Sequence, residues 1–581
     1  MKTLATSFLT VVASVAVLGL IPTALAHGDD MKMEKGEADK PLPEDQYPPT
    51  YFALADHRTT IYGHIALMVL AWVFILPPAV MLSLARSRYT LAAQFAFAAV
   101  NGVGLLLGTV YNASTPDLYP NNAHHKLGWI VTWIVGAQAL IGLLARVAGV
   151  FSRKARLAGP SHERQSFIPV STEAMAEHES CYPRDSRFSN DSGQGTERHT
   201  ESLRSHSLSG TESPPIPMRD VPLHKEFQPH DDDDDFETHM PKVFGSGAAG
   251  SALRKVAGMM SSTVWRGFMF AYNVVDRTIL LLGFVTICTG VITYGRFFEG
   301  HEIFSGLAHW IKGGIFFWLG LFTLGRWAGS FGELGWAWNV RPKQAGQNWR
   351  PSAEFVESFL IFFYGSTNIF LEHLGNWGGE YSAQDLEHIS ITVLFIGGGL
   401  FGMLVESTRI RELLNVTVSD AVQTPESTYR DEERSELREP ETYPFSMNPI
   451  PALVILLLGI MMSSHTQESM ISSMIHKQWG QLLTGASFAR GLSYVLTYLK
   501  PPKSIYPSRP PTEILTSFGL LSGGIIFMAS ASDTVNGMIH YELDAMFMYT
   551  VTMGLVGLLM AWVIIVVAIK GWAVGKERMR A

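Results

Sequence analysis

The sequence predicts an all-α protein that crosses a membrane many times. Of its 581 residues, 47% are hydrophobic and only 17% are charged, whereas soluble proteins carry about 25% charged residues. The apolar residues form runs of about 20, the length of helix that spans a bilayer core of about 30 Å. The formal net charge of −8 argues against nucleic acid as a partner. The two cysteines are too few for a disulfide framework.

The first residues have the pattern of a secretory signal peptide. Lys2 precedes an apolar run over residues 9–21, and the small residues Ala24 and Ala26 follow it. We expect cleavage after Ala26, so that residues 1–26 are the signal; an uncleaved anchor is the alternative. Either outcome brings the chain into the secretory pathway (endoplasmic reticulum, Golgi, vacuole or plasma membrane). Residues 27–57 then form a polar segment on the outer side.

Eleven apolar segments are expected to span the bilayer. They cover residues 61–84, 91–111, 126–150, 277–294, 307–325, 355–371, 388–405, 450–463, 479–499, 513–531 and 545–569. The eighth is short, and the tenth contains Ser517, Ser522 and the Gly523-Gly524 pair, so these two are the weakest. Lysine and arginine gather in alternate connections, which marks the cytoplasmic side. The pattern predicts an outer or luminal N-terminus and a cytoplasmic C-terminus.

Residues 151–262 separate two membrane modules, at 58–150 and 263–575. The separating segment is rich in serine, glutamate, arginine and proline, and it contains an acidic run over 231–235. Such a composition cannot bury enough apolar surface to fold. We therefore expect a disordered cytoplasmic linker, which is also where regulatory proteins would bind.

Histidines at one end of the first module suggest a haem site. His64 lies near the start of the first span and His125 just before the third. These two spans run in the same direction, so both imidazoles are expected at about the same depth near the outer face. Two helices of a bundle that each present a histidine can hold a haem between them. The pattern predicts His64 and His125 as ligands of one haem b.

The residues around these histidines resemble the cytochrome b561 fold. Leu67-Met68 and Ala71-Trp72 follow His64, and Leu127-Gly128 follows His125. The resemblance implies two histidine ligands to haem b and ascorbate-type electron transfer. That family has a second histidine pair near the opposite face, and the second and fourth spans here contain no histidine. We expect a single haem without an evident electron path across the membrane; a fold that has lost its haem is the alternative.

The second module has imidazoles and carboxylates at the outer ends of its spans. Such groups bind metal ions or orient metal-bound imidazoles. The signal is compositional, because no zinc-protease spacing occurs. The candidate ligands for copper, iron or zinc are His309, Glu372, His373, Glu387, His388, His465 and His476. Arg490 lies within the ninth span and needs a partner if it faces inward.

The glycine-rich stretch 316–325 and the Glu-His pairs beside the spans resemble the C-terminal domain of fungal Ytp-type membrane proteins. They are also distantly similar to the transmembrane protein 45 family. The resemblance implies the order of module, linker and module, without an activity. Three functions stay open: a haem-b electron-transfer protein with a small-molecule donor or metal ion on the outer side, a metal-binding or transport protein, and a non-catalytic membrane scaffold.

Overall fold

The computed structural model describes residues 47–158, 262–300, 302–338, 351–368, 381, 383–422, 440, 442–465, 467, 469–504 and 506–579. Within these ranges every regular element is a helix, which confirms the all-α fold class. The expected signal peptide, most of the outer segment 27–57 and the linker beyond Ala158 lie outside the described residues. Residues 141–266 form one unit, and residues 1–140 with 267–581 form the other. All candidate functional residues belong to the second unit.

Eight of the described helices are long and apolar enough to cross a membrane, which supports a polytopic protein. They are Arg58–Leu84, Thr90–Ser114, Ala123–Ala145, Thr263–Gly295, Ile303–Ala328, Asp385–Glu406, Pro511–Ala529 and Ala545–Arg578. The other three predicted spans are also helical but are shorter or more polar. They correspond to α10 (Ala353–Asn368), α13 (Ile450–Ser463) and α14 (Met470–Leu499). The number of eleven spans therefore stays a prediction.

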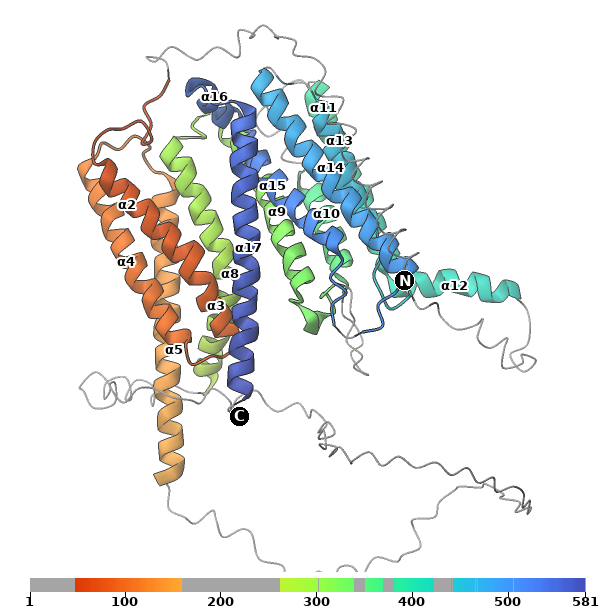
Figure 1. Cartoon of the computed structure of the whole chain (residues 1–581), viewed down its shortest axis with the longest axis horizontal. Helices are drawn as coiled ribbons and strands as arrows, with labels where there is room; N and C mark the ends of the chain where they lie inside the picture. Colours follow the sequence, from red (N-terminus) through yellow and green to blue (C-terminus); the bar gives the residue numbers. More distant parts are fainter. Residues whose placement is uncertain are drawn as a thin grey trace, which may run out of the picture. The chain divides into compact units, whose positions relative to one another are not determined.

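Four helical segments pack side by side in an N-terminal bundle (Figure 1). Its core joins Trp72 and Leu76 to Phe97, Val131 and Ile279. The last of these lies on a helix that the sequence analysis assigned to the second module. The elements are α2 (Arg58–Val69), η2 (Leu70–Ile75), α3 (Leu76–Leu84), α4 (Thr90–Ser114), α5 (Ala123–Ala158) and α8 (Ser262–Gly295).

The first bundle helix changes its winding just before two prolines. The π-helical segment Leu70–Ile75 lies directly upstream of Pro77-Pro78. Proline has no backbone N–H, so the carbonyl of Val73, four residues before Pro77, loses its usual donor. Trp562 of α17 (Ala545–Arg578) supplies one instead, since its Nε1 donates to the Val73 carbonyl at 2.9 Å. The prolines therefore create an acceptor that attaches the last helix to the first.

In the C-terminal part, α15 (Pro511–Ala529) is the most buried of the eight membrane-length helices. α15 packs against α9 (Glu302–Ala328) and α14, and its Leu520, Ile526 and Phe527 belong to the main core. α11 (Ala383–Glu406) pairs with α10 and α13. Two further helices, α12 (Thr408–Val422) and α16 (Ser532–His540), form where the sequence predicted only connections.

Candidate functional site

Two histidines face each other at one end of the N-terminal bundle. His64 of α2 lies with its Nδ1 2.8 Å from the Gly104 carbonyl of α4. His124 of α5 lies with its Nδ1 3.1 Å from the Thr286 carbonyl of α8. A carbonyl oxygen only accepts hydrogen bonds, so both Nδ1 atoms carry the proton. In the neutral imidazoles each Nε2 therefore keeps a lone pair that a metal can use.

Glycines give the two rings their positions. A Cβ atom on Gly108 would lie 2.7 Å from Nδ1 of His64, and one on Gly290 would lie 3.1 Å from Cε1 of His124. Any larger residue would push the rings away from the neighbouring backbones. The ring centroids are 6.4 Å apart, with an angle of 78° between the planes. All four helices of the bundle thus contribute to holding this pair.

The structure places His124, and not the predicted His125, opposite His64. The His125 side chain is exposed, and its backbone N–H donates to Asn122 Oδ1 at 2.9 Å. Consecutive residues of an α-helix point about 100° apart, so only one of two adjacent histidines can face the bundle interior. The predicted residue His125 therefore lies next to the facing pair and does not belong to it.

The C-terminal bundle brings a second histidine pair together. The ring centroids of His309 on α9 and His476 on α14 are 6.0 Å apart. Each Nδ1 lies 2.8 Å from the carbonyl of the residue one turn earlier, Ser305 and Ser472 respectively. Both Nδ1 atoms therefore donate, as in the first pair, and both Nε2 atoms are left to bind a ligand.

The structure describes three of the other five predicted metal ligands. His465 Nδ1 lies 3.2 Å from Glu387 Oε2, and the half-buried His388 follows Glu387 on α11. Glu372 and His373 lie outside the described residues. Among the residues that the structure does describe, no three histidine, cysteine or acidic side chains gather into a group that could hold a metal. The metal site stays a prediction.

The structure contains a buried ionic network that was not predicted from the sequence. Its members are Arg326, Glu354, Glu357, Arg490 and Glu513. Arg326 Nη2 lies 2.9 Å from Glu354, and Arg326 Nη1 lies 3.5 Å from Glu357. Arg490 Nη1 lies 3.2 Å from Glu357, and Arg490 Nη2 lies 3.1 Å from Glu513. The side chains are at most 7% exposed. Four helices, α9, α10, α14 and α15, are thereby joined.

Neutral groups complete the ionic network. The Trp338 ring lies 4.8 Å from the Arg326 guanidinium carbon and 5.8 Å from that of Arg490. Thr323 accepts from Arg490 at 2.7 Å, and Tyr494 donates to Glu354 at 3.2 Å. In the sequence, the spacing of Glu354 and Glu357 indicates two carboxylates on one face of a helix. The unpaired Arg490 in an apolar span pointed to the same place.

Comparisons with known proteins agree with this architecture. A family model described as "Protein YTP1-like, C-terminal" matches residues 282–571, and a domain of unknown function (DUF2427) matches residues 45–148. The chain is 33% identical to the uncharacterized membrane protein C3B8.06 of Schizosaccharomyces pombe, over 88% of this chain and 94% of that protein.

Two proteins of Saccharomyces cerevisiae are also similar. The uncharacterized membrane protein YCR061W is 39% identical over 52% of this chain and 48% of its own length. Protein YTP1 is 21% identical over 50% of this chain and 54% of its own length. With its apolar helices and these matches over nearly the whole length, the chain belongs to the family of fungal YTP1-like membrane proteins.

Proposed function

We propose that the N-terminal bundle is a haem-b electron-transfer module with His64 and His124 as the iron ligands. The observation that carries the proposal is the facing pair of imidazoles, each fixed through Nδ1 by a carbonyl of another helix. The distribution of lysine and arginine supports an outer or luminal position for this end of the bundle. The electron donor would then be a small molecule or a metal ion on that side.

The separation of the rings fits one metal centre. An imidazole nitrogen would bind a metal at about 2.0–2.1 Å, so two rings that share one metal ion must lie close together. The observed separation is 6.4 Å. The donor set fits as well, because a proton on Nδ1 leaves Nε2 for iron. Because Gly108 and Gly290 have no side chains, the imidazole rings can lie against the backbone of the neighbouring helices.

The protein residues control the ligands, and a bound haem would supply one-electron chemistry. The Gly104 and Thr286 carbonyls accept the Nδ1 protons, which sets the tautomer and the orientation of each ring. Such hydrogen bonds also make the coordinating nitrogen more basic. His64 and His124 come from different helices, so the loss of either removes one side of the proposed site.

The proposal predicts an absorption spectrum that depends on His124 and not on its neighbour. Purified full-length protein should have a reduced-minus-oxidised α-band, and both His64→Ala and His124→Ala should lose it. His125→Ala is the matched control, one residue away and exposed, and should keep the band. A colourless, iron-free wild-type protein would end the proposal. Loss of the band in His125→Ala alone would favour the pair predicted from the sequence.

Metal binding by the C-terminal bundle is a second candidate function. His309 and His476 both direct Nδ1 at a backbone carbonyl, which leaves both Nε2 atoms for a metal. The two imidazoles would provide half of a four-coordinate site for zinc or copper. Purified protein incubated with Zn²⁺ or Cu⁺ and then desalted should retain metal, measured by mass spectrometry of the element. The double variant His309→Ala/His476→Ala should retain much less, while His125→Ala should not differ from wild type. Equal retention in all three proteins would exclude this candidate.

A further inference from the structure

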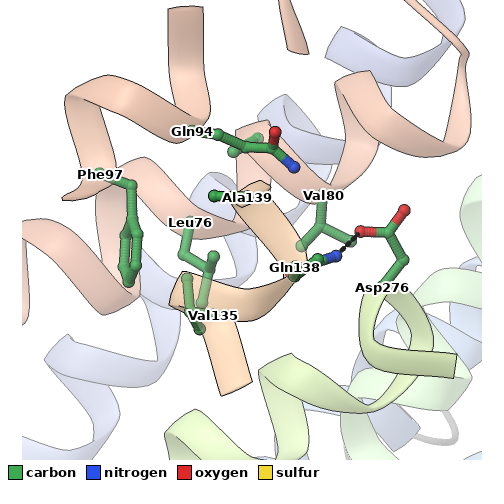
Figure 2. A pocket seen from close by; sticks show the side chains of 9 residues that line it. Leu76, Val80, Gln94, Phe97, Val135, Gln138, Ala139 and Asp276 are labelled. Carbon is green, nitrogen blue, oxygen red and sulfur yellow. Dashed lines mark hydrogen bonds between the residues drawn. The ribbon is translucent and has the colours of Figure 1, made fainter. Parts of the chain in front are cut away.

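An aspartate is buried inside the N-terminal bundle, away from the histidines. Asp276 of α8 is 5% exposed and lies within a membrane-length apolar helix. Ser83 Oγ donates to its Oδ2 and Gln138 Nε2 donates to its Oδ1, both at 2.5 Å. Figure 2 shows Gln138 pointing at this carboxylate. Two neutral donors on two other helices therefore hold the acid in place.

Within the described ranges, no arginine, lysine or histidine forms an ion pair with Asp276. The neighbouring Arg277 is directed elsewhere, since its Nη1 donates to the Asn273 carbonyl at 3.1 Å. Ser83 and Gln138 contact Asp276 from two other helices, and Gln94 lines the adjoining cavity; none of these three side chains carries a charge. An ionised carboxylate without a counter-charge costs several kcal/mol inside a protein or a bilayer. Neutralisation by a bound cation or proton would remove that cost.

A small cavity lies beside the carboxylate (Figure 2). Its volume is about 20 Å³, and about 10–15 Å³ is enough for one water molecule. The apolar part of its lining comes from Leu76, Val80, Phe97 and Val135. Hard metal cations take about six or more oxygen ligands, which this lining does not offer. The cavity therefore favours a proton and a water over a metal cation.

A chain of hydroxyl groups leads away from Asp276. Tyr272 OH and Ser83 Oγ are 3.0 Å apart, and either can donate to the other. Gln94 Nε2 donates to Tyr272 OH at 2.9 Å. With an ionised Asp276, Ser83 donates to the carboxylate. With a protonated Asp276, the acid donates to Ser83 Oγ and the Ser83 hydroxyl turns toward Tyr272. Asp276 and Ser83 are hydrogen-bonded in both states after rotation of hydroxyl groups alone.

We propose that Asp276 is a reversible proton-binding site of the N-terminal bundle, with one water in the adjoining cavity. The site exchanges a proton between a carboxylate oxygen and the water in the cavity, while the Ser83 and Tyr272 hydroxyls reorient. The titratable groups nearest to it are Tyr272 on its own helix and Arg277 beside it. The proposal uses no part of the haem site and stands independently of it.

Infrared difference spectroscopy of the full-length protein tests the proposal. Spectra between acid and alkaline pH should contain the carbonyl stretch of a protonated carboxylic acid that Asp276→Asn lacks. Asp56→Asn, which changes an exposed carboxylate, should keep that band. Ser83→Ala retains the acid and should shift the frequency of the band, because the protonated carboxyl loses its hydrogen-bond partner.

Two results would overturn the proposal. One is a pH-difference spectrum that is the same in wild type, Asp276→Asn and Ser83→Ala. The other is a band that responds to replacing choline chloride by sodium chloride at constant pH, because the site would then take a metal cation instead of a proton.

Discussion

Replacement of Arg490 by methionine is expected to lower the free energy of unfolding by about 3–5 kcal/mol, the cost of removing one partner from a buried ion pair. Arg490 contacts Glu357 at 3.2 Å and Glu513 at 3.1 Å, and all three side chains are almost completely buried. Without the guanidinium, Glu513 would lose its ion-pair partner and Glu357 would keep only Arg326 among the described residues, at 3.5 Å. The Glu513 side chain is fully buried, so its charge would stay in an apolar interior.

The effect is measurable as the temperature at which purified protein stops eluting as a single species in size-exclusion chromatography. Arg409→Met on α12 is the control, because it removes the same side chain from an exposed position and should change stability by less than about 0.5 kcal/mol. Adding Glu513→Gln to Arg490→Met should recover part of the loss, since the carboxylate left without its partner becomes neutral. An Arg490→Met protein as stable as Arg409→Met would contradict the ionic network.

The membrane helices were predictable because their signal is local. A run of about 20 apolar residues has few alternatives to a membrane helix, and α4 was expected over 91–111, where the structure has Thr90–Ser114. The role of α15 was not predictable in this way. Ser517, Ser522 and the Gly523-Gly524 pair made it one of the weakest predicted spans, yet they are buried because α15 is surrounded by protein. Ser517 donates to the Gly320 carbonyl of α9 at 2.8 Å.

The sites depend on pairings that a sequence does not contain. His124 and His125 are equivalent in sequence, and only the rotation of α5 about its axis decides which one faces His64. Arg326 and Glu513 lie at the ends of two predicted spans, 307–325 and 513–531. The partners of both residues lie on other helices. The sequence does not show which face of each helix is covered by its neighbours.

Gly524→Leu is expected to separate α9 from α15 and to destabilise the protein by about 3 kcal/mol or more, at the upper end of the cost of overpacking. A Cβ atom at Gly524 would lie 2.6 Å from the Gly313 carbonyl oxygen and 2.7 Å from the Phe317 nitrogen. A Cβ atom at Gly313 would in turn lie 2.5 Å from the Gly524 carbonyl oxygen. These are backbone atoms, so the new side chain cannot be accommodated by a change of rotamer.

The same elution assay measures this effect, with Gly554→Leu of α17 as the control because nothing lies within 4 Å of its Cβ position. Gly313→Leu should be about as damaging as Gly524→Leu, and the double variant should cost less than the sum, since both remove one helix contact. On α9, Thr323 contacts α14 and Arg326 contacts α10, while Glu513 lies on α15. The close contact between α9 and α15 at the glycines therefore also sets the distances within the ionic network. A Gly524→Leu protein that behaves like Gly554→Leu would mean that the two helices do not cross at these glycines. The buried arginines would then lack the close helix packing that brings them within reach of their carboxylates.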